Sequence, residues 1–179
     1  MPERPVIRLQ TTVYRFHNPR WAFAPESGEG ARRHGGRFNP RGIAALYTSL
    51  HPITALYEAN QDLQAVQPST ICSYAVDCTD ILDISTPERC QAAGIDYDIL
   101  GIGWELIHAD GDIPATWDLA QQLIKARVAG IVVPSFAINT TSECRNVVFW
   151  DWSREPPHQV QVNDDFGRLP HDQSSWKSS

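Results

Sequence analysis

Several short segments of the chain have the pattern of apolar and polar residues that is typical of β-strands. The segment 69–77 (STICSYAVD) alternates apolar and polar positions, as in a strand that is buried on one face, and 11–16 (TTVYRF) is β-branched and aromatic. Two further runs, 131–134 and 146–150, are apolar enough to be central strands of a sheet. Weaker strands are predicted at 43–49 (IAALYTS) and 80–84 (DILDI).

Apolar residues recur at helical spacing after the strand at 43–49. Ser49 can serve as the N-cap and Pro52 is tolerated in the first turn, so a helix is predicted to begin near Ser49. On this helix Ile53, Leu56, Tyr57 and Asn60 follow the spacing i, i+3, i+4, i+7 of one helix face, and Glu58 lies away from the centre of that face. By periodicity alone, such a glutamate is usually solvated, but it can equally well face a cleft.

Two more helices and one long loop are predicted. Residues 86–88 (TPE) have the order of cap, proline and acid that is expected at a helix start, and this helix should end near Gly94. A second helix is expected over 116–129, closed by Gly130. The segment 17–40 has little periodicity and many glycines, prolines and arginines, which predicts a long loop, and loops of this length tend to be functional or disordered.

The order of the elements favours an α+β fold. Strands outnumber helices and do not alternate regularly with them, so we expect mostly antiparallel sheets with flanking helices instead of a doubly wound parallel sheet. The 179 residues fit a single domain. We expect that domain to span 11–152, with an N-terminal extension at 1–10 and a polar C-terminal tail at 153–179.

The charge of the chain narrows the class of ligand. The formal net charge of -6 argues against direct nucleic-acid binding, whose affinity comes mostly from phosphate neutralisation. Positive charge is nevertheless concentrated near the N-terminus, at Arg15, Arg20, Arg32, Arg33, Arg37 and Arg41. A basic pocket on an acidic chain suits a small anionic ligand better than a polymer.

The sequence predicts neither a membrane segment nor a metal site. Residues 1–10 lack the apolar core of a secretory signal, and no apolar run approaches the roughly 20 residues of a membrane helix. We therefore expect a cytoplasmic location. The four cysteines form no CxxC pair and have no accompanying histidine pair, so neither zinc nor another metal is expected.

One glycine-rich segment remains as a candidate for binding an anion. No complete dinucleotide-binding or Walker phosphate loop occurs, since the third glycine or the lysine is missing in each candidate. The segment 35–40 (GGRFNP) combines two glycines, which let a backbone approach a ligand and expose its N–H groups, with Arg37, whose forked donors match phosphate oxygens. Taken alone, this segment is equally well interpreted as a surface turn.

The segment becomes specific in combination with others. Six short motifs follow one another along the chain: 14–15 (YR), 35–40 (GGRFNP), 46–49 (LYTS), 55–58 (ALYE), 133–135 (VPS) and 145–148 (RNVV). In this order they resemble the RES domain family over roughly 13–152. The family is named for an arginine, a glutamate and a serine, which here would be Arg15, Glu58 and Ser135. Phe38 stands where the family commonly has tryptophan.

The resemblance implies a fold similar to ADP-ribosyltransferases and an activity that degrades NAD. It also implies that the protein is the toxin of a toxin–antitoxin pair, neutralised by an Xre-type helix-turn-helix antitoxin. NAD would be the substrate, and no separate cofactor is expected.

The chemistry of NAD cleavage assigns each candidate residue an expected role. Nicotinamide departs from ribose as a neutral pyridine, so a single carboxylate suffices, and Glu58 is the candidate that would stabilise the developing positive charge. Arg15 and Arg37, with the backbone of Gly36, would hold the pyrophosphate. Tyr47 is expected to stack on the nicotinamide ring, although a tyrosine in an apolar strand is as often simply part of the core.

Two further residues are expected to support the site. Ser135 would donate a hydrogen bond to a ribose hydroxyl or a phosphate, and Asn146 would help to order the site. The acceptor of the ribose stays open between water, phosphate and a protein, so ADP-ribosyl transfer is an alternative. A second alternative is a non-catalytic nucleotide- or RNA-binding module that uses the arginines and the tryptophans Trp21, Trp104 and Trp117 as stacking surfaces.

Overall fold

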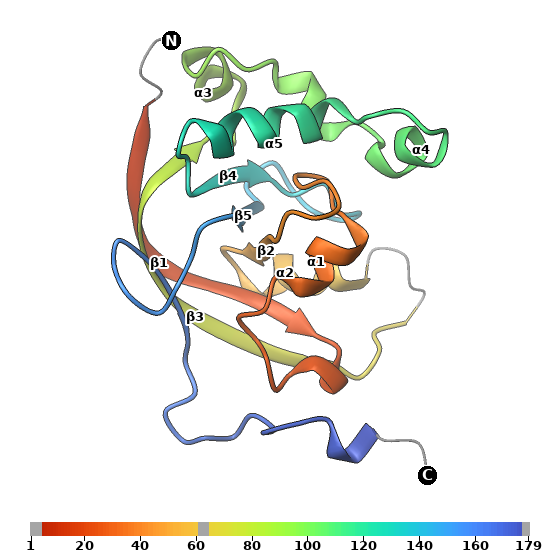
Figure 1. The fold of residues 1–179 in the computed structure, drawn as a ribbon, viewed down its shortest axis with the longest axis vertical. Helices are drawn as coiled ribbons and strands as arrows, with labels where there is room; N and C mark the ends of the chain where they lie inside the picture. Colours follow the sequence, from red (N-terminus) through yellow and green to blue (C-terminus); the bar gives the residue numbers. More distant parts are fainter. Residues whose placement is uncertain (1–4, 61–64, 177–179) are drawn as a thin grey trace.

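The computed structural model describes residues 5–60 and 65–176. Its two longest strands lie side by side and curve along one edge of the molecule (Figure 1). Strand β1 (Val6–His17) pairs antiparallel with β3 (Thr70–Asp83) along almost its whole length. Both strands are longer than the sequence predicts. The two strands expected at 69–77 and 80–84 are one, because the polar residues between them form a bulge in which Asp80 has a φ of 60°.

The sheet closes on itself. Strands β2 (Leu46–Ser49), β5 (Arg145–Phe149) and β4 (Gly130–Pro134) bridge the gap between β1 and β3, in the order β1-β2-β5-β4-β3. Because β3 also pairs with β1, these strands follow one another around a closed ring. Among the pairs of strands that the structure describes, only β3–β4 is parallel. The expected α+β fold with mostly antiparallel pairing is confirmed, whereas the closure was not predicted.

A further strand lies in the segment that the sequence predicts as a polar tail. Strand β6 (His158–Val162) pairs antiparallel with residues 74–78 of β3. Its central residue Val160 is fully buried, while Gln159 and Gln161 on either side are more accessible. One buried position between polar neighbours is too short a pattern to recognise from sequence. The last three residues, 177–179, lie outside the described part of the chain.

Two helices cover one face of the sheet. Helix α3 (Pro87–Ala92) is capped as predicted, because Oγ1 of Thr86 accepts a hydrogen bond from the backbone of Arg89. Helix α5 (Ala115–Lys125) runs across β4 (Figure 1) and ends earlier than predicted, since Arg127 has a φ of 65° and the chain then enters β4. The short helix α4 (Trp104–Ala109), which was not predicted, projects to one side (Figure 1).

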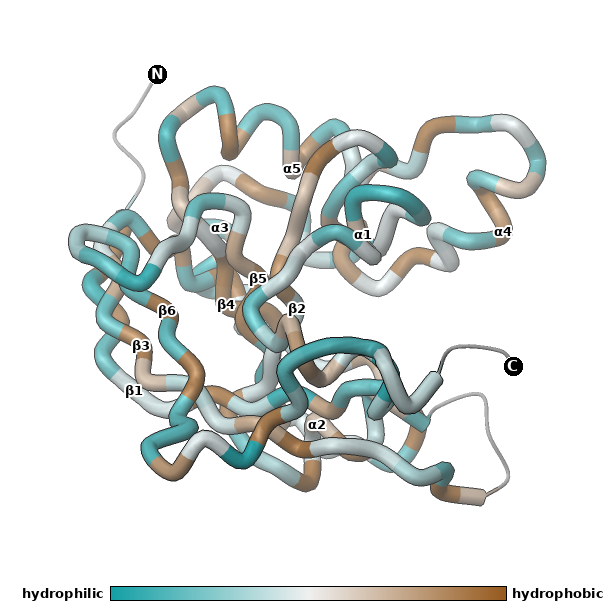
Figure 2. Tube along the Cα trace, turned by 60° about the horizontal axis from the view of Figure 1, so that its bottom comes forward, coloured by the Kyte–Doolittle hydropathy of each residue, from teal (hydrophilic) through white to brown (hydrophobic). Residues whose placement is uncertain are grey.

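Apolar side chains form two clusters on opposite faces of the sheet. One cluster draws on all six strands and fills the space that the curved sheet encloses, and the other lies between the sheet and helices α3 and α5. Alternate residues of β4 belong to different clusters, with Val132 in the first and Ile131 and Val133 in the second. Figure 2 shows the resulting apolar stretches of β4 and β5 at the centre of the molecule. Burial of both faces explains why these strands are continuously apolar.

The structure differs from the prediction in the segment 17–40 and at the start of the helix that follows β2. The segment predicted as a loop at 17–40 contains helix α1 (Glu29–His34) and one 3₁₀ turn, η1 (Pro19–Trp21). Helix α2 (Pro52–Asn60), which packs against β1 and β2, begins three residues after Ser49. Ser49 is therefore the last residue of β2 and not a helix cap. Further 3₁₀ turns are η2 (Tyr97–Gly101) and η3 (Ser174–Trp176).

Candidate active site

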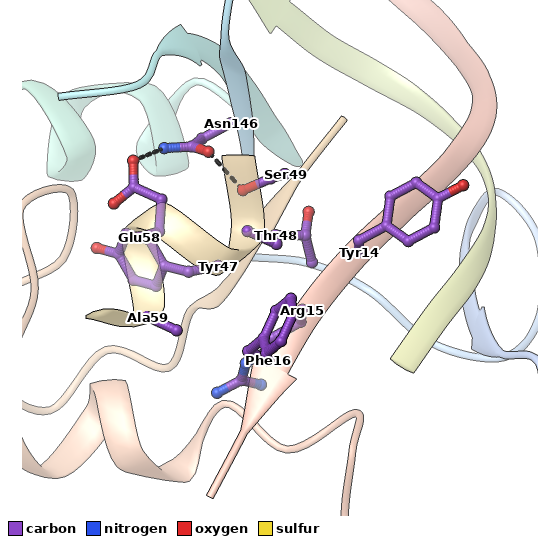
Figure 3. A pocket seen from close by; sticks show the side chains of 10 residues that line it. Tyr14, Arg15, Phe16, Tyr47, Thr48, Ser49, Glu58, Ala59 and Asn146 are labelled. Carbon is purple, nitrogen blue, oxygen red and sulfur yellow. Dashed lines mark hydrogen bonds between the residues drawn. The ribbon is translucent and has the colours of Figure 1, made fainter. Parts of the chain in front are cut away.

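A cleft opens where β1, β2 and β5 meet helix α2. It consists of two adjoining cavities of about 260 Å³ and 340 Å³, and both are lined by Arg15, Tyr47, Glu58 and Asn146. Figure 3 shows these four side chains around the smaller cavity. Gly36 and Arg37 line the larger cavity, and Ser135 bonds to a residue of the cleft, so all seven predicted site residues lie together.

The carboxylate of Glu58 is held by one of its two oxygens. Its Oε1 accepts hydrogen bonds from Oγ of Ser135 and from Nδ2 of Asn146, each at 2.5 Å. Ser135 directly follows β4, and Asn146 lies on β5, so donors carried by two strands meet at one residue of helix α2. Figure 3 shows the bond from Asn146. Within residues 5–60 and 65–176, no donor is found for Oε2. That oxygen is therefore available to a ligand.

Ser49, which sequence reasoning placed at a helix start, belongs to this network. Its Oγ donates a hydrogen bond of 2.7 Å to Oδ1 of Asn146, which lies opposite it in the β2–β5 pair (Figure 3). Because Oδ1 accepts from Ser49, the amide of Asn146 is oriented with its Nδ2 toward Glu58. The sequence signal for this role is weak, since serine is common both at helix caps and at strand ends.

The hydroxyl of Tyr47 ties β2 to the glycine-rich segment. It donates to Oδ1 of Asn39 at 2.7 Å and accepts from the backbone N–H of Phe38 at 2.9 Å. Burial raises the pKa of Tyr47 well above its ordinary value, so the hydroxyl stays protonated. With its hydroxyl fixed in this way, the ring of Tyr47 forms part of the wall of both cavities.

Gly36 is required by close approach and not by its backbone donor. A Cβ atom at Gly36 would lie 2.6 Å from the hydroxyl of Tyr47 and 2.7 Å from Oδ1 of Asn39. The N–H groups of Gly35 and Gly36 donate to the carbonyls of Ala31 and Asn39 at 2.8 Å and 2.9 Å. The expectation that these amides bind a pyrophosphate is therefore not supported, because both are used within the chain.

Arg37 is anchored at one nitrogen. Its NH1 donates to the carbonyls of Leu100 and Ile102, at 3.3 Å and 2.5 Å, and its guanidinium lies 4.8 Å from the centre of the Phe136 ring. Burial lowers the pKa of Arg37, and the negative charge of Glu58 opposes this shift. An arginine remains charged under such conditions, so Arg37 places a positive charge in the larger cavity.

Arg15 places a second positive charge at the end of β1. Its NH1 donates to the carbonyl of Ser27 at 3.1 Å, and burial lowers its pKa. In Figure 3 the guanidinium of Arg15 is directed away from Asn146 and Ser49. Arg15 and Glu58 line both halves of the cleft, and Arg37 and Glu105 line the larger half. Two guanidinium groups beside the carboxylate of Glu58 suit a ligand with a polar sugar next to an anionic group.

The tryptophans that could serve as stacking surfaces differ in their accessibility. Trp117 is buried and its Nε1 donates to the carbonyl of Gly36 at 2.7 Å, so it supports the cleft wall and does not offer a free stacking surface. Trp21, by contrast, is 51% exposed. Among the described residues, no helix is long and apolar enough to cross a membrane, and no three metal-ligating side chains form a group that could hold an ion.

Comparisons with known proteins agree with the resemblance drawn from the motifs. The family model described as "RES domain" matches residues 12–172, a region that includes β6. Two curated relatives named NAD(+) phosphorylase MbcT, from Mycobacterium tuberculosis (strain ATCC 25618 / H37Rv) and Mycobacterium bovis, are each 33% identical over 115 residues. The match covers 58% of this chain and 61% of each relative, so this chain spans about three fifths of the length of those relatives.

A solved structure has the same fold. A chain in the crystal structure of the M. tuberculosis MbcT–MbcA toxin–antitoxin complex superimposes with a TM-score of 0.58 at 24% identity. The superposition covers 90% of this chain and 85% of that chain. It includes nearly the whole chain and therefore shows a shared fold.

Proposed function

The chain belongs to the RES domain family, and from this membership we propose that it is an enzyme that cleaves the bond between nicotinamide and ribose in NAD. The observation that carries the proposal is the carboxylate of Glu58, held at one oxygen by Ser135 and Asn146 in a cleft with two arginines. The name NAD(+) phosphorylase, which the curated relatives carry, supports the same reaction.

The cleft needs only one carboxylate for this reaction. The electron pair of the C–N bond leaves with nicotinamide, which departs as a neutral pyridine and needs no acid, unlike the sugar alkoxide in ordinary glycoside hydrolysis. Positive charge develops on the ribose. The free Oε2 of Glu58 accepts a hydrogen bond from a ribose hydroxyl and stabilises this charge, while Ser135 and Asn146 keep the carboxylate in place.

The remaining predicted residues take the other parts of the substrate. Arg15 and Arg37 bind the pyrophosphate, and the ring of Tyr47 packs against the nicotinamide. An oxygen of phosphate or of water then forms the new bond to the ribose carbon. Inorganic phosphate gives ADP-ribose 1″-phosphate, and water gives ADP-ribose with release of one proton to the solvent. NAD is consumed as a substrate, and the reaction needs no further cofactor.

The biological role that we propose is that of a toxin in a toxin–antitoxin pair acting in the cytoplasm. Loss of NAD would stop the growth of the cell that makes the enzyme, so a partner must keep it inactive. The fold shared with a chain of the MbcT–MbcA toxin–antitoxin complex supports such a partner. We propose an Xre-type helix-turn-helix antitoxin, and a fold related to that of the ADP-ribosyltransferases.

The test is to incubate the purified protein with NAD, with and without phosphate, and to quantify nicotinamide and the ADP-ribose products by chromatography. Glu58→Gln is the matched control, because it keeps the shape of the side chain and removes its charge. We expect it to lower the rate of nicotinamide release by about a hundredfold or more. Dependence on phosphate identifies the acceptor.

Three results would contradict the proposal. If correctly folded protein releases no nicotinamide, the site is not a NAD-cleaving centre. If the ADP-ribose label instead becomes attached to a protein band, the enzyme is an ADP-ribosyltransferase acting on a protein. Binding of NAD without turnover that survives Glu58→Gln would identify a non-catalytic nucleotide-binding module.

A further inference from the structure

A third cavity, of about 550 Å³, adjoins the cleft and has no role in the reaction described so far. We call it the aromatic cavity, because its lining includes the aromatic side chains of Phe16, His17, Trp21 and Phe23. Ser27 and Arg33 also line it. It shares Arg15 with both halves of the cleft, and it shares Gly30 with the larger half. Arg15, which lines the cleft together with Glu58, thus also lines a second compartment.

The aromatic cavity presents an accessible flat ring. Trp21 is 51% exposed, its ring centre lies 6.4 Å from that of Phe23, and the guanidinium of Arg20 lies 5.6 Å from the ring of Trp21. The exposed indole of Trp21 offers a flat aromatic face to a ligand in this cavity. Stacking on an aromatic side chain favours the binding of any nucleobase, because every base has a π-face.

The wall below this ring is rigid. Nε2 of the buried His17 lies 2.6 Å from the hydroxyl of Tyr74, and that hydroxyl donates to the carbonyl of Pro25 at 2.8 Å. Since the single hydroxyl proton goes to Pro25, the N–H of neutral His17 donates to Tyr74. These bonds join β1, β3 and the segment that carries Trp21 and Phe23.

The charges around the aromatic cavity are mostly satisfied within the chain. Both oxygens of Glu29 are bonded to Arg32 and Arg33, at 2.7 Å in each contact. Glu29 therefore does not leave an unbalanced negative charge beside a nucleotide. The positive charge of Arg15 stays at the boundary with the cleft, which places it between the ribose site at Glu58 and the ring of Trp21.

The two compartments match the two halves of a dinucleotide. NAD consists of two nucleosides joined by a pyrophosphate, so a substrate with its nicotinamide riboside at Glu58 and its pyrophosphate at Arg15 extends beyond Arg15. The guanidinium of Arg15 points away from Asn146 (Figure 3) and bonds to Ser27, which lines the aromatic cavity. We propose that the aromatic cavity binds the adenosine half of NAD, with the adenine stacked on Trp21. This inference rests on the proposed function.

The experiment compares two mononucleotides that each represent one half of NAD. The affinities of AMP and of nicotinamide mononucleotide are measured by calorimetry for the wild type and for Trp21→Ala, and KM and kcat for NAD are measured beside them. We expect Trp21→Ala to weaken AMP binding and to raise KM for NAD by about tenfold, which is a typical effect of losing one base stack. Nicotinamide mononucleotide binding and kcat should change less than about twofold.

Two variants control for general effects. Trp21→Phe keeps a ring for stacking and should retain most of the AMP affinity. Trp176→Ala removes a tryptophan that is 46% exposed and lies in η3, away from the three compartments, and it should change neither ligand. Far-UV circular dichroism of each variant confirms that it is folded.

The inference is overturned if the wild type does not bind AMP at millimolar concentration, or if Trp21→Ala leaves AMP affinity unchanged. It is also overturned if Trp21→Ala weakens AMP and nicotinamide mononucleotide equally, because the effect is then not confined to the adenosine half. Failure of the proposed function is a separate result, seen as absence of nicotinamide release by the wild type. In that case the AMP measurement still decides whether the aromatic cavity binds a purine nucleotide.

Discussion

Replacement of Ser49 by alanine tests whether the proposed catalytic role of Glu58 depends on a residue that is linked to it only through Asn146. Ser49 is 2% exposed and its hydroxyl donates to Oδ1 of Asn146, whose Nδ2 in turn donates to Glu58. Without the hydroxyl, Oδ1 of Asn146 loses its donor, and the orientation of the amide then depends on Glu58 alone. We therefore expect Ser49→Ala to act on the reaction through Asn146, as a positioning effect.

The magnitude follows from one hydrogen bond. A neutral hydrogen bond contributes about 0.5–1.5 kcal/mol, and about 1.4 kcal/mol corresponds to a tenfold change in rate. If the whole contribution serves to orient Asn146, kcat falls by about two- to tenfold, and KM for NAD changes little. The free energy of unfolding should fall by about 1–3 kcal/mol, because Oδ1 of Asn146 becomes a partly buried acceptor without its partner.

The assay is nicotinamide release under saturating NAD, together with urea unfolding. Ser85→Ala is a matched control, since Ser85 is 3% exposed and its hydroxyl also donates at 2.7 Å to a side-chain oxygen, Oδ1 of Asp83. Ser85 lies outside the cleft. Both variants should lose stability, Ser85→Ala at least as much because its partner Asp83 is a carboxylate, but only Ser49→Ala should lose kcat.

A double-mutant cycle decides whether the effect passes through Asn146. If Ser49 acts by orienting that amide, the double variant Ser49→Ala with Asn146→Ala is no slower than Asn146→Ala alone. Additive losses in kcat would refute the reasoning, because Ser49 would then act on the reaction by another route. An unchanged kcat in Ser49→Ala, with stability reduced as expected, would refute it as well.

Two further predictions concern the walls of the cleft and of the aromatic cavity. Gly36→Ala brings a Cβ within 2.6 Å of the hydroxyl of Tyr47, so we expect it to lower the free energy of unfolding by about 1–3 kcal/mol in urea. Gly103→Ala, where the added Cβ meets its nearest atom at 3.8 Å, should be nearly neutral, and equal effects of the two would contradict the close-approach argument. Burial and the charge of Arg15 lower the pKa of His17 from its ordinary value of 6.5 to about 3. Between these two pH values the imidazole binds a proton in the unfolded chain but not in the folded chain. Stability from this group is therefore lost as pH falls from 6.5 toward 3, by about 2 kcal/mol at pH 5, and urea unfolding should show that His17→Gln lacks this part of the pH dependence.

Local signals in the sequence were sufficient for the elements that depend on neighbouring residues. The cap at Thr86 and the apolar runs of β4 and β5 are such cases. The closure of the sheet is different, because it depends on pairs such as Val13 with Tyr74 that are far apart along the chain. The bulge at Asp80 also hid the continuity of β3, since a polar interruption looks the same whether a strand ends or only bends.

The composition of the site could be predicted from motifs and chemistry, but its bonding could not. The motifs identified Glu58, Ser135 and Asn146, while nothing in the sequence indicated that the last two donate to the same oxygen of the first. Ser49 was misassigned because its hydroxyl is equally suited to a cap and to a partner across a sheet. For Gly36, the sequence indicated the need for glycine but not the reason, which is the hydroxyl of Tyr47.

The position of β5 explains why the site and the closed sheet depend on each other. Strand β5 lies between β2 and β4, and it carries Asn146 to the point where it meets Ser49 of β2 and Glu58 of α2. The donors to Glu58 come from residues 77 and 88 positions further along the chain. A chain in which β2 and α2 are formed but β5 is not inserted therefore has the carboxylate without Asn146, and β4, which leads to Ser135, is then not joined to β2 through β5. The same strand pairing that closes the sheet thus assembles the proposed catalytic group.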